Sequence, residues 1–278
     1  MNLDDWRSRI NNLDEEILKL LNQRGTAALR IGELKRQQGL PYYIPEREAQ
    51  VLDRLVGLTG GPLSGDAVRA IWREIVSASL ALEHPLTVAY LGPPGTFTHQ
   101  AAVRRFGSSA QLLAVRTIAE IFDEVERDRA EFGVVPVENS TDGAVNVTLD
   151  RLIDSDVTIT GEMTLDISQH LISRAVELGE VKMVCSHPQG LAQCRAWLAA
   201  HLPEAATEET PSTAAAVERA RDDATVAAIA SDIAAQVHGV PILRGRIEDN
   251  SANSTRFPSS AGGPSRPPGE TRRPSSSR

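Results

Sequence analysis

The sequence has few cysteines and no long apolar run. Only Cys185 and Cys194 occur among the 278 residues, and neither has His or Cys neighbours at metal-ligand spacing. We therefore expect two reduced packing residues, and neither a metal nor a cofactor. No apolar run is long enough to cross a bilayer. The N-terminal residues also lack the basic and apolar regions of a signal peptide, so we expect a cytoplasmic protein with no membrane role.

The sequence also has no excess of basic over acidic residues. The chain has 29 Lys and Arg against 37 Asp and Glu, a formal net charge of −8. This balance disfavours a general role in binding nucleic acid or anionic membranes, although it leaves room for local cationic pockets. The composition is 41% hydrophobic and 24% charged, which is typical of globular proteins, and the length suggests two domains.

Residues 5–38 contain no proline, and apolar side chains recur there at steps of three and four. The stripe consists of Trp6, Ile10, Leu13, Ile17, Leu20, Ala27, Ile31 and Leu34. This spacing predicts one long amphipathic helix. A helix of this length needs a partner, so we expect a homodimer through the N-terminal helices. Shorter helices over 45–58 and after Ser64 complete a three-helix module that is too thin for a good core of its own.

Arg24 stands in this stripe, where an apolar residue is expected. It either pairs with a structural carboxylate, reaches solvent, or belongs to an anion-binding pocket. Lys35 favours the pocket, because eleven residues are about three helical turns and place it on nearly the same face. Arg7 lies about 100° away from that face. Two antiparallel copies of the helix could bring Arg7 of one chain to Arg24 and Lys35 of the other. A plain dimerisation module would leave Arg24 unexplained.

In their sequence context these residues resemble the all-helical chorismate mutase family. The matching segments surround Arg7 and include 21–24, 31–35, 45–48 and Ser79 with Glu83. The resemblance implies an intertwined dimer in which one active-site arginine comes from the other subunit. It also implies a pericyclic rearrangement of chorismate to prephenate, which needs conformational clamping and charge stabilisation rather than a nucleophile. The implied roles are carboxylate binding by Arg7, Arg24 and Arg47, the ether oxygen for Lys35, the substrate hydroxyl for Glu48, and further contacts for Ser79 and Glu83.

Two positions depart from the family pattern. Ile44 stands where many members have Asp, which is expected to weaken closure over the substrate. Glu83 stands where some members have Gln. A hydrogen bond to the ether oxygen needs a donor, and only a protonated Glu donates. We therefore predict that mutase activity falls as the pH rises and Glu83 loses its proton, and that Glu83→Gln flattens this profile.

After a linker at His84 and Pro85, short apolar runs alternate with helical patterns. This alternation predicts an α/β layer fold, in which ligands bind at loops beyond the carboxyl ends of strands. The expected strands include 87–91, 112–115, 132–137, 157–159, 167–172, 181–185 and 226–229, and the expected helices include 98–105, 118–127, 188–202, 212–221 and 231–237.

Polar loops follow several of these strands. Gly95 and Thr96 precede a helix and form either an anion-binding N-terminus or a plain turn. The segments 139–141 and 186–189 follow buried strands, where a capped turn is the alternative to a ligand site. Their recurrence in one segment, with Thr255 and Arg256 near its end, favours a shared cleft.

Taken in order, these segments resemble the prephenate dehydratase family. The similarity spans 87–257 and rests on 92–102, 136–140, 186–189 with Gln193 and Cys194, and 253–257. It implies two α/β lobes like those of type II periplasmic-binding proteins, with the site between them. Pro94 replaces the Glu or Lys often found in the first motif.

The resemblance also implies a reaction and its residues. Prephenate loses a carboxylate and the ring hydroxyl together, and aromatisation to phenylpyruvate drives the step. Thr255 is assigned to the leaving hydroxyl as a hydrogen-bond donor or relay, since a threonine is too weak an acid to transfer a proton freely. His187 is a second candidate acid. Arg256 is assigned to a carboxylate. The remaining implied pocket residues are Thr96, Asn139, Ser140, Thr141, Ser186 and Gln189.

We therefore expect a mutase domain over 1–85, a dehydratase domain over 86–257 and a disordered low-complexity tail over 258–278. Together the domains would convert chorismate to phenylpyruvate in L-phenylalanine biosynthesis. Family members continue into a regulatory ACT domain, which is missing here, so we expect a truncated or naturally unregulated chain without feedback by phenylalanine. The alternatives are a mutase whose dehydratase is inactivated by C-terminal truncation, and a small-molecule-binding module on the α/β fold.

Overall fold

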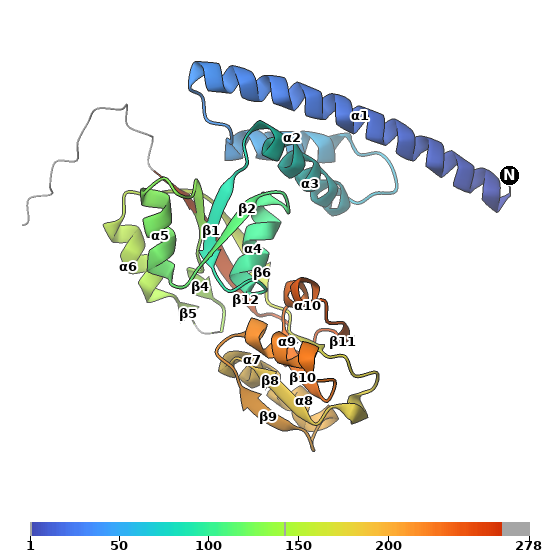
Figure 1. Cartoon of the computed structure of the whole chain (residues 1–278), viewed down its shortest axis with the longest axis vertical. Helices are drawn as coiled ribbons and strands as arrows, with labels where there is room; N and C mark the ends of the chain where they lie inside the picture. Colours follow the sequence, from blue (N-terminus) through green and yellow to red (C-terminus); the bar gives the residue numbers. More distant parts are fainter. Residues whose placement is uncertain (1, 142, 263–278) are drawn as a thin grey trace, which may run out of the picture.

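The computed structural model describes residues 2–141 and 143–262, with a helical unit next to the first of two α/β lobes and the second lobe at the opposite end (Figure 1). This arrangement confirms the fold class expected from the sequence. In the part of the chain that the structure describes, no helix is both long enough and apolar enough to cross a membrane.

The helical unit consists of α1 (Leu3–Gln38), α2 (Pro45–Leu58) and α3 (Gly65–Glu83), close to the predicted bounds. Local signals fix their ends. Asn2 forms a capping box with Asp5, and Gly39 ends α1 in the left-handed conformation at φ 64°. Pro45 occupies the first turn of α2, and Ser64 caps α3 by accepting a hydrogen bond from the Ala67 amide.

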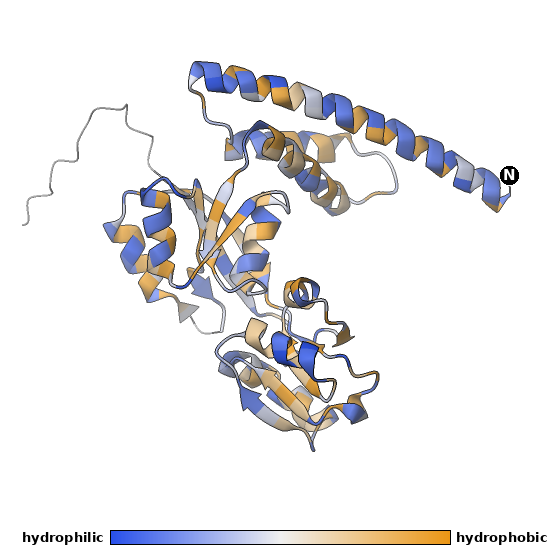
Figure 2. Ribbon diagram, viewed as in Figure 1, coloured by the Kyte–Doolittle hydropathy of each residue, from blue (hydrophilic) through white to orange (hydrophobic). Residues whose placement is uncertain are grey.

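The N-terminal half of α1 extends beyond α2 and α3 (Figure 1), and its apolar stripe is visible as orange segments (Figure 2). Only Ala28 and Gly32 of α1 are buried. Six large apolar side chains before Arg24 are 49–64% exposed: Leu3, Trp6, Ile10, Leu13, Ile17 and Leu20. A stripe of this length is unusual on a monomer surface and is typical of an interface.

Lobe 1 is built on a sheet in the order β2-β1-β3-β12-β4-β5, with β6 also paired to β12. Its strands are β1 (Thr87–Leu91), β2 (Gln111–Val115), β3 (Phe132–Val134), β4 (Glu138–Asn139), β5 (Gly143–Ala144), β6 (Thr158–Asp166) and β12 (Ser254–Ala261). Its helices are α4 (Phe97–Phe106), α5 (Ile118–Glu126) and α6 (Asn146–Asp154). Tyr90, Phe132 and Phe257 belong to its core.

Lobe 2 has a second sheet in the order β11-β7-β10-β8-β9. The elements are β7 (His170–Ile172), β8 (Met183–Ser186), β9 (Ala206–Glu209), β10 (Val226–Ala230) and β11 (Ile242–Arg244), with α7 (Pro188–Gln193), α8 (Arg195–His201), α9 (Thr213–Asp222), α10 (Asp232–His238) and a 3-10 turn at Leu178–Glu180. Cys185 and Cys194 are free and buried here, as expected. Burial raises the pKa of the Cys194 thiol to about 12, which keeps it unreactive.

The chain passes between the lobes twice. It leaves lobe 1 after β6 and returns from lobe 2 into β12, which pairs with β6 on one side and with β3 and β4 on the other. The last strand is therefore in the interior of the lobe 1 sheet, next to the crossing segments. This position places the Thr255 region where the two lobes face each other.

The expected end of the last strand at Phe257 is wrong, because β12 continues to Ala261. Pro258 cannot donate a backbone hydrogen bond, but its carbonyl accepts one from the Val135 amide at 3.4 Å. Ser259 and Ser260 are small enough to be fully buried in the sheet. Composition alone suggested disorder here, whereas pairing to β6 and β3 orders these residues. The rest of the predicted tail, 263–278, lies outside the described residues.

The helix expected over 188–202 is two helices. Cys194 has a non-helical conformation, with φ −117° and ψ 15°, and it separates α7 from α8. The Asp249 carboxylate accepts hydrogen bonds from the Ala196 and Trp197 amides at 2.8 and 2.9 Å, so it caps the second helix from a distant part of the chain. Helix α6 and strands β4, β5, β9 and β11 were not predicted from the sequence.

Candidate active sites

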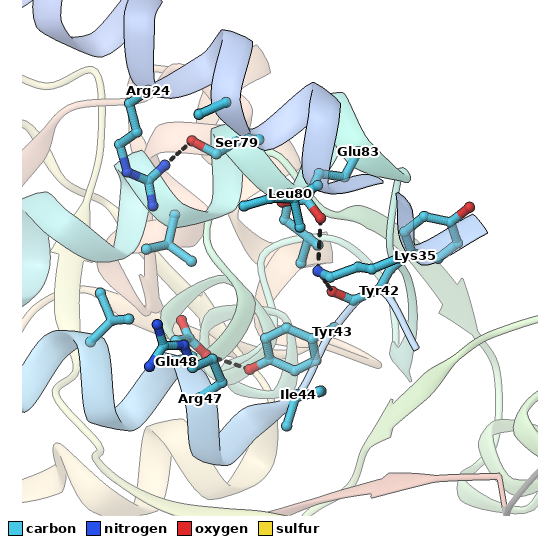
Figure 3. A pocket seen from close by; sticks show the side chains of 15 residues that line it. Arg24, Lys35, Tyr42, Tyr43, Ile44, Arg47, Glu48, Ser79, Leu80 and Glu83 are labelled. Carbon is cyan, nitrogen blue, oxygen red and sulfur yellow. Dashed lines mark hydrogen bonds and ion pairs between the residues drawn. The ribbon is translucent and has the colours of Figure 1, made fainter. Parts of the chain in front are cut away.

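A cavity of about 370 Å³ lies among the three helices of the helical unit (Figure 3). Six predicted site residues line it together: Arg24, Lys35, Arg47, Glu48, Ser79 and Glu83. Arg24 from α1 and Arg47 from α2 approach it from opposite sides (Figure 3). Three cations therefore surround one space suited to a small dianion.

Arg24 is held in the stripe without a carboxylate partner among the described residues. Its guanidinium donates to the Ser79 hydroxyl and, at 3.4 Å, to the Ile75 carbonyl. It lies over the Trp72 ring at 5.9 Å. Burial lowers the pKa of Arg24 from its ordinary value, although arginine remains charged near neutral pH. Glu83 is the nearby carboxylate that favours the charged form, but it makes no ion pair with Arg24. A half-buried cation without a paired carboxylate among the described residues supports the anion-pocket interpretation over a structural ion pair.

Lys35 and Glu83 form an ion pair at one end of the cavity. The Lys35 Nζ donates to Glu83 Oε2 at 2.8 Å and to the Tyr42 carbonyl at 2.7 Å. Gly32 makes this end compact, since a Cβ there would stand 3.0 Å from the Glu83 Cβ and 3.1 Å from its Cα. The sequence placed Lys35 and Arg24 on one helix face, and both side chains line the cavity.

Glu48 lies on the floor of the cavity and is only 8% exposed. The Tyr43 hydroxyl donates to its Oε2, and Arg105 Nη1 donates to the same oxygen at 3.1 Å. Burial and the Glu48 charge raise the pKa of Tyr43 well above its ordinary value, so its hydroxyl keeps its proton. Neither donor was predicted from the sequence, because both lie outside the motifs that carry the family resemblance.

Arg7 is not part of this cavity. It lies near the exposed start of α1 and pairs with Asp4 at 3.3 Å. Seventeen residues of helix place it about 26 Å from Arg24 along the axis. Ile44 does line the cavity and is the N-cap position of α2, where it provides no side-chain hydrogen bond.

A second cavity of about 590 Å³ lies between the two lobes. Predicted residues from both lobes line it: Asn139, His187, Gln189 and Thr255. Thr255 is only 7% exposed, and its Oγ1 accepts a hydrogen bond from Asn139 Nδ2 at 2.7 Å. The Thr141 amide donates to Asn139 Oδ1 at 2.8 Å, which fixes the orientation of the Asn139 amide. Because Thr255 accepts from Asn139, its own O–H is directed away from this donor and can serve a ligand.

Other predicted cleft residues have structural hydrogen bonds instead. The Ser186 hydroxyl is buried and donates to the Ile229 carbonyl at 2.7 Å. Thr96 caps α4 and donates to the Leu91 carbonyl at 2.9 Å. Ser140 accepts from the Ser254 amide at 3.0 Å, and Thr141 lines an adjoining hollow that shares Gln189 and Gln193 with the cleft. The structure therefore does not bring Ser186, Thr96 and Ser140 to the cleft surface, and it places Thr141 at the edge of the cleft.

Arg256 does not line the cleft either. Successive side chains of a strand point to opposite faces, so Arg256 points away from the side that carries Thr255. Its guanidinium donates to the Glu162 carboxylate at 2.7 and 2.9 Å and to Glu138 at 2.8 Å. These two carboxylates raise the pKa of Arg256 above its ordinary value. The expected carboxylate contact to substrate is thus replaced by internal ion pairs.

The cleft also has lining residues that the sequence analysis did not single out as site residues. They include Phe97, Thr98, Gln169, Gln193 and Phe257. Phe97 and Thr98 open helix α4, so their amides have no acceptor within the helix. Among the described lining residues none is Lys or Arg. The cleft therefore offers neutral donors and one histidine, in contrast to the cationic cavity of the helical unit.

Comparisons with known proteins divide the chain in the same way. The model of the chorismate mutase type II family matches residues 6–84, and that of the prephenate dehydratase family matches 88–259. A bifunctional chorismate mutase/prephenate dehydratase of Aquifex aeolicus is 46% identical over 259 residues, which cover 92% of this chain and 72% of the relative.

Two solved structures resemble the α/β part. Prephenate dehydratase from Arthrobacter aurescens in complex with L-Phe is 33% identical with a TM-score of 0.59, over 67% of this chain and 63% of that one. GqqA, described as a novel type of quorum quenching acylase, is 28% identical with a TM-score of 0.58, over 66% and 67%.

Proposed function

The chain belongs to the bifunctional chorismate mutase/prephenate dehydratase family, and from this premise we propose that it converts chorismate to prephenate and then prephenate to phenylpyruvate. The observation that carries the proposal is the presence of two different cavities on one chain. One is surrounded by three cations, and the other contains a buried threonine hydroxyl that accepts a hydrogen bond but donates none to the described residues. These reactions belong to L-phenylalanine biosynthesis, for which we propose a cytoplasmic location.

We propose that residues 1–85 form the mutase domain and that the dehydratase domain follows from residue 86 through β12. In the mutase, Arg24 and Arg47 would bind the two carboxylates of chorismate and hold the reacting atoms together. Lys35 would stabilise the negative charge that develops on the ether oxygen. The Oε1 atom of Glu48 would accept a hydrogen bond from the substrate hydroxyl.

Glu83 remains a second candidate for contact with the ether oxygen. In the structure it accepts from Lys35, so a donor role would require that Glu83 bind a proton. We expect mutase activity to fall with rising pH and Glu83→Gln to flatten the profile, measured as initial rates of chorismate loss from mildly acidic to neutral pH. A flat wild-type profile would remove the donor role and leave Lys35 as the group that faces the ether oxygen.

A homodimer would explain the two features of α1 that one chain leaves unused. The exposed stripe before Arg24 could pack against its copy from a second chain. An antiparallel arrangement would carry the partner's Arg7 toward the cavity that contains Arg24 and Lys35. Sedimentation should then give twice the chain mass, and Arg7→Ala should weaken chorismate binding without dissociating the dimer.

In the cleft, the Thr255 O–H would donate to the ring hydroxyl of prephenate as that group leaves. Asn139 would hold the Thr255 oxygen in the orientation that makes this possible. The amides of Phe97 and Thr98, with the glutamine side chains of the cleft, would contact the carboxylates. His187 stays a less direct candidate acid, since its Nδ1 accepts from the Gln189 amide at 3.4 Å.

The direct test supplies chorismate and prephenate in separate reactions with the purified chain. Phenylpyruvate from both substrates would support the bifunctional proposal. Prephenate that accumulates from chorismate without further conversion would support the alternative of a mutase attached to an inactive dehydratase. Because a fold of this kind also occurs in a protein described as an acylase, the assay is the deciding observation for the α/β part.

A further inference from the structure

Glu48 has one occupied and one open carboxylate oxygen. The Tyr43 hydroxyl and Arg105 both donate to Oε2. Among the described residues nothing donates to Oε1. A substrate hydroxyl in the cavity needs one acceptor, and Oε1 is the oxygen that remains. The two donors therefore decide which way the carboxylate faces.

Both donors are anchored in the α/β part of the molecule rather than in the helical unit. Arg105 belongs to the last turn of α4, where its guanidinium lies over the Phe106 ring at 5.4 Å and beside Gly161 in β6, since a Cβ on that glycine would stand 3.4 Å from Arg105 Nη2. Tyr43 belongs to the loop between α1 and α2, but its ring packs against Phe106 and Phe132 at centroid distances of 5.9 and 5.2 Å. The orientation of Glu48 is thus fixed by the core of lobe 1.

We propose that Arg105 is a positioning residue for the mutase reaction and acts across the domain boundary. The inference rests on the proposed mutase function and adds a contribution of the dehydratase domain to the mutase site. A carboxylate that is 8% exposed requires a positive partner, because a buried unpaired charge is costly. Arg105 supplies that charge and leaves Oε1 directed toward the cavity. Without it, Glu48 would rotate or draw in water, and the substrate hydroxyl would lose a fixed acceptor.

Helix α4 contributes residues to both sites. Its first turn contributes Phe97 and Thr98 to the lining of the cleft, and its last turn contributes Arg105 to Glu48. The position of one rigid helix therefore influences both sites. The mutase cavity therefore has one of its proposed positioning groups in lobe 1.

The test uses the full chain with Arg105→Ala, Arg105→Lys and a matched control, Arg104→Ala. Arg104 is the neighbouring arginine on α4, is exposed and makes no ion pair with a described residue. Initial rates on chorismate give the mutase kcat and KM, and rates on added prephenate give the dehydratase values. Thermal unfolding reports on folding.

We expect Arg105→Ala to lower the mutase kcat/KM roughly tenfold or more, as for a misplaced substrate contact. Most of the loss should lie in KM, because the hydroxyl is held in both the ground and transition states. Arg105→Lys should recover part of the loss. Arg104→Ala should match wild type, and all three variants should keep the dehydratase kcat/KM on prephenate.

A double variant separates positioning from general support of the fold. With Glu48→Ala there is no carboxylate left to orient, so adding Arg105→Ala should cause no further loss of mutase activity. Effects that multiply instead would overturn the proposal, and so would an Arg105→Ala variant that behaves like Arg104→Ala while wild type is active. Parallel loss of both activities with a lowered unfolding temperature, not restored by Arg105→Lys, would mean a structural role. A wild-type chain that makes no prephenate would instead refute the proposed mutase function itself.

Discussion

The two cavities would receive closely related dianions, yet they are built differently. The cavity of the helical unit is lined by Arg24, Lys35 and Arg47, whereas the described lining of the cleft has no Lys or Arg. The proposed chemistry accounts for this difference. A rearrangement benefits from a firm grip on both carboxylates. In the dehydration, one carboxylate leaves as CO2 together with the ring hydroxide. A cation that stabilises that carboxylate in the ground state would raise the barrier, whereas the remaining carboxylate can be bound by neutral amides.

The two cavities also differ in whether all their residues come from a single structural unit. The cleft is closed by contacts between its own lobes, such as Gln100 with Asp232 and the Ser231 hydroxyl with the Gly95 carbonyl. The helical cavity depends on Arg105 of lobe 1 and, under the dimer proposal, on Arg7 of the partner subunit. The helical cavity therefore differs from the cleft in its positive charge and in its need for residues from outside the helical unit.

The largest expected effect tests the role of charge. Lys35→Met removes the cation nearest the proposed ether oxygen and should lower mutase kcat by about 100- to 1,000-fold. Dehydration of added prephenate should not change. The control is Arg30→Ala, a largely exposed cation on the same helix that pairs with Glu33. Equal activities of the Lys35 and Arg30 variants on chorismate would contradict the assignment.

A smaller effect tests the compact packing of the helical site. Gly32→Ala places a Cβ 3.1 Å from the Glu83 Cα, so α1 and α3 must separate. We expect a loss of about 1–3 kcal/mol in unfolding free energy and a lower mutase rate. Gly57→Ala is the matched control, because no atom lies within 4 Å of its added Cβ, and it should leave stability unchanged or slightly raised. Denaturant unfolding and chorismate assays measure both variants.

The smallest effect concerns acid stability of the α/β part. Burial lowers the pKa of His99, whose Nδ1 accepts from the Gly95 amide and whose ring stacks on Tyr90 at 5.0 Å. The unfolded chain then binds a proton more readily than the folded one. The contribution of His99 to folding stability is fully present above the ordinary histidine pKa of about 6.5, which applies to the unfolded chain. It is lost as the pH falls through the lowered pKa of the folded chain. The difference in unfolding free energy between wild type and His99→Gln should shrink as the pH falls below about 6.5. A difference that stays constant with pH would contradict this expectation.

The sequence predicts the parts of the fold that depend on local patterns. The apolar period and the caps at Gly39, Pro45 and Ser64 locate the three helices closely. The same period places Arg24 and Lys35 on one face, and both line the cavity. Neither result requires knowledge of distant segments.

What the sequence does not predict depends on partners far along the chain. From its motif, Ser186 is expected to contact a ligand, but in the fold its hydroxyl donates to the Ile229 carbonyl. Arg256 is likewise expected to bind substrate, but it pairs with Glu138 and Glu162. The contacts of Glu48 with Tyr43 and Arg105 require the docking of two domains. The break at Cys194 depends on Asp249, which follows 55 residues later. Motifs locate a site in the chain, but tertiary hydrogen bonds decide which side chains remain available to a ligand.

Two separate active sites on one chain should catalyse successive reactions. The most direct measurement follows Thr255→Ala and wild type over time with chorismate as the sole substrate, recording prephenate and phenylpyruvate. Wild type should form phenylpyruvate, whereas the variant should form prephenate at the wild-type rate and accumulate it without forming phenylpyruvate. Phenylpyruvate formed at an undiminished rate by Thr255→Ala would contradict this expectation.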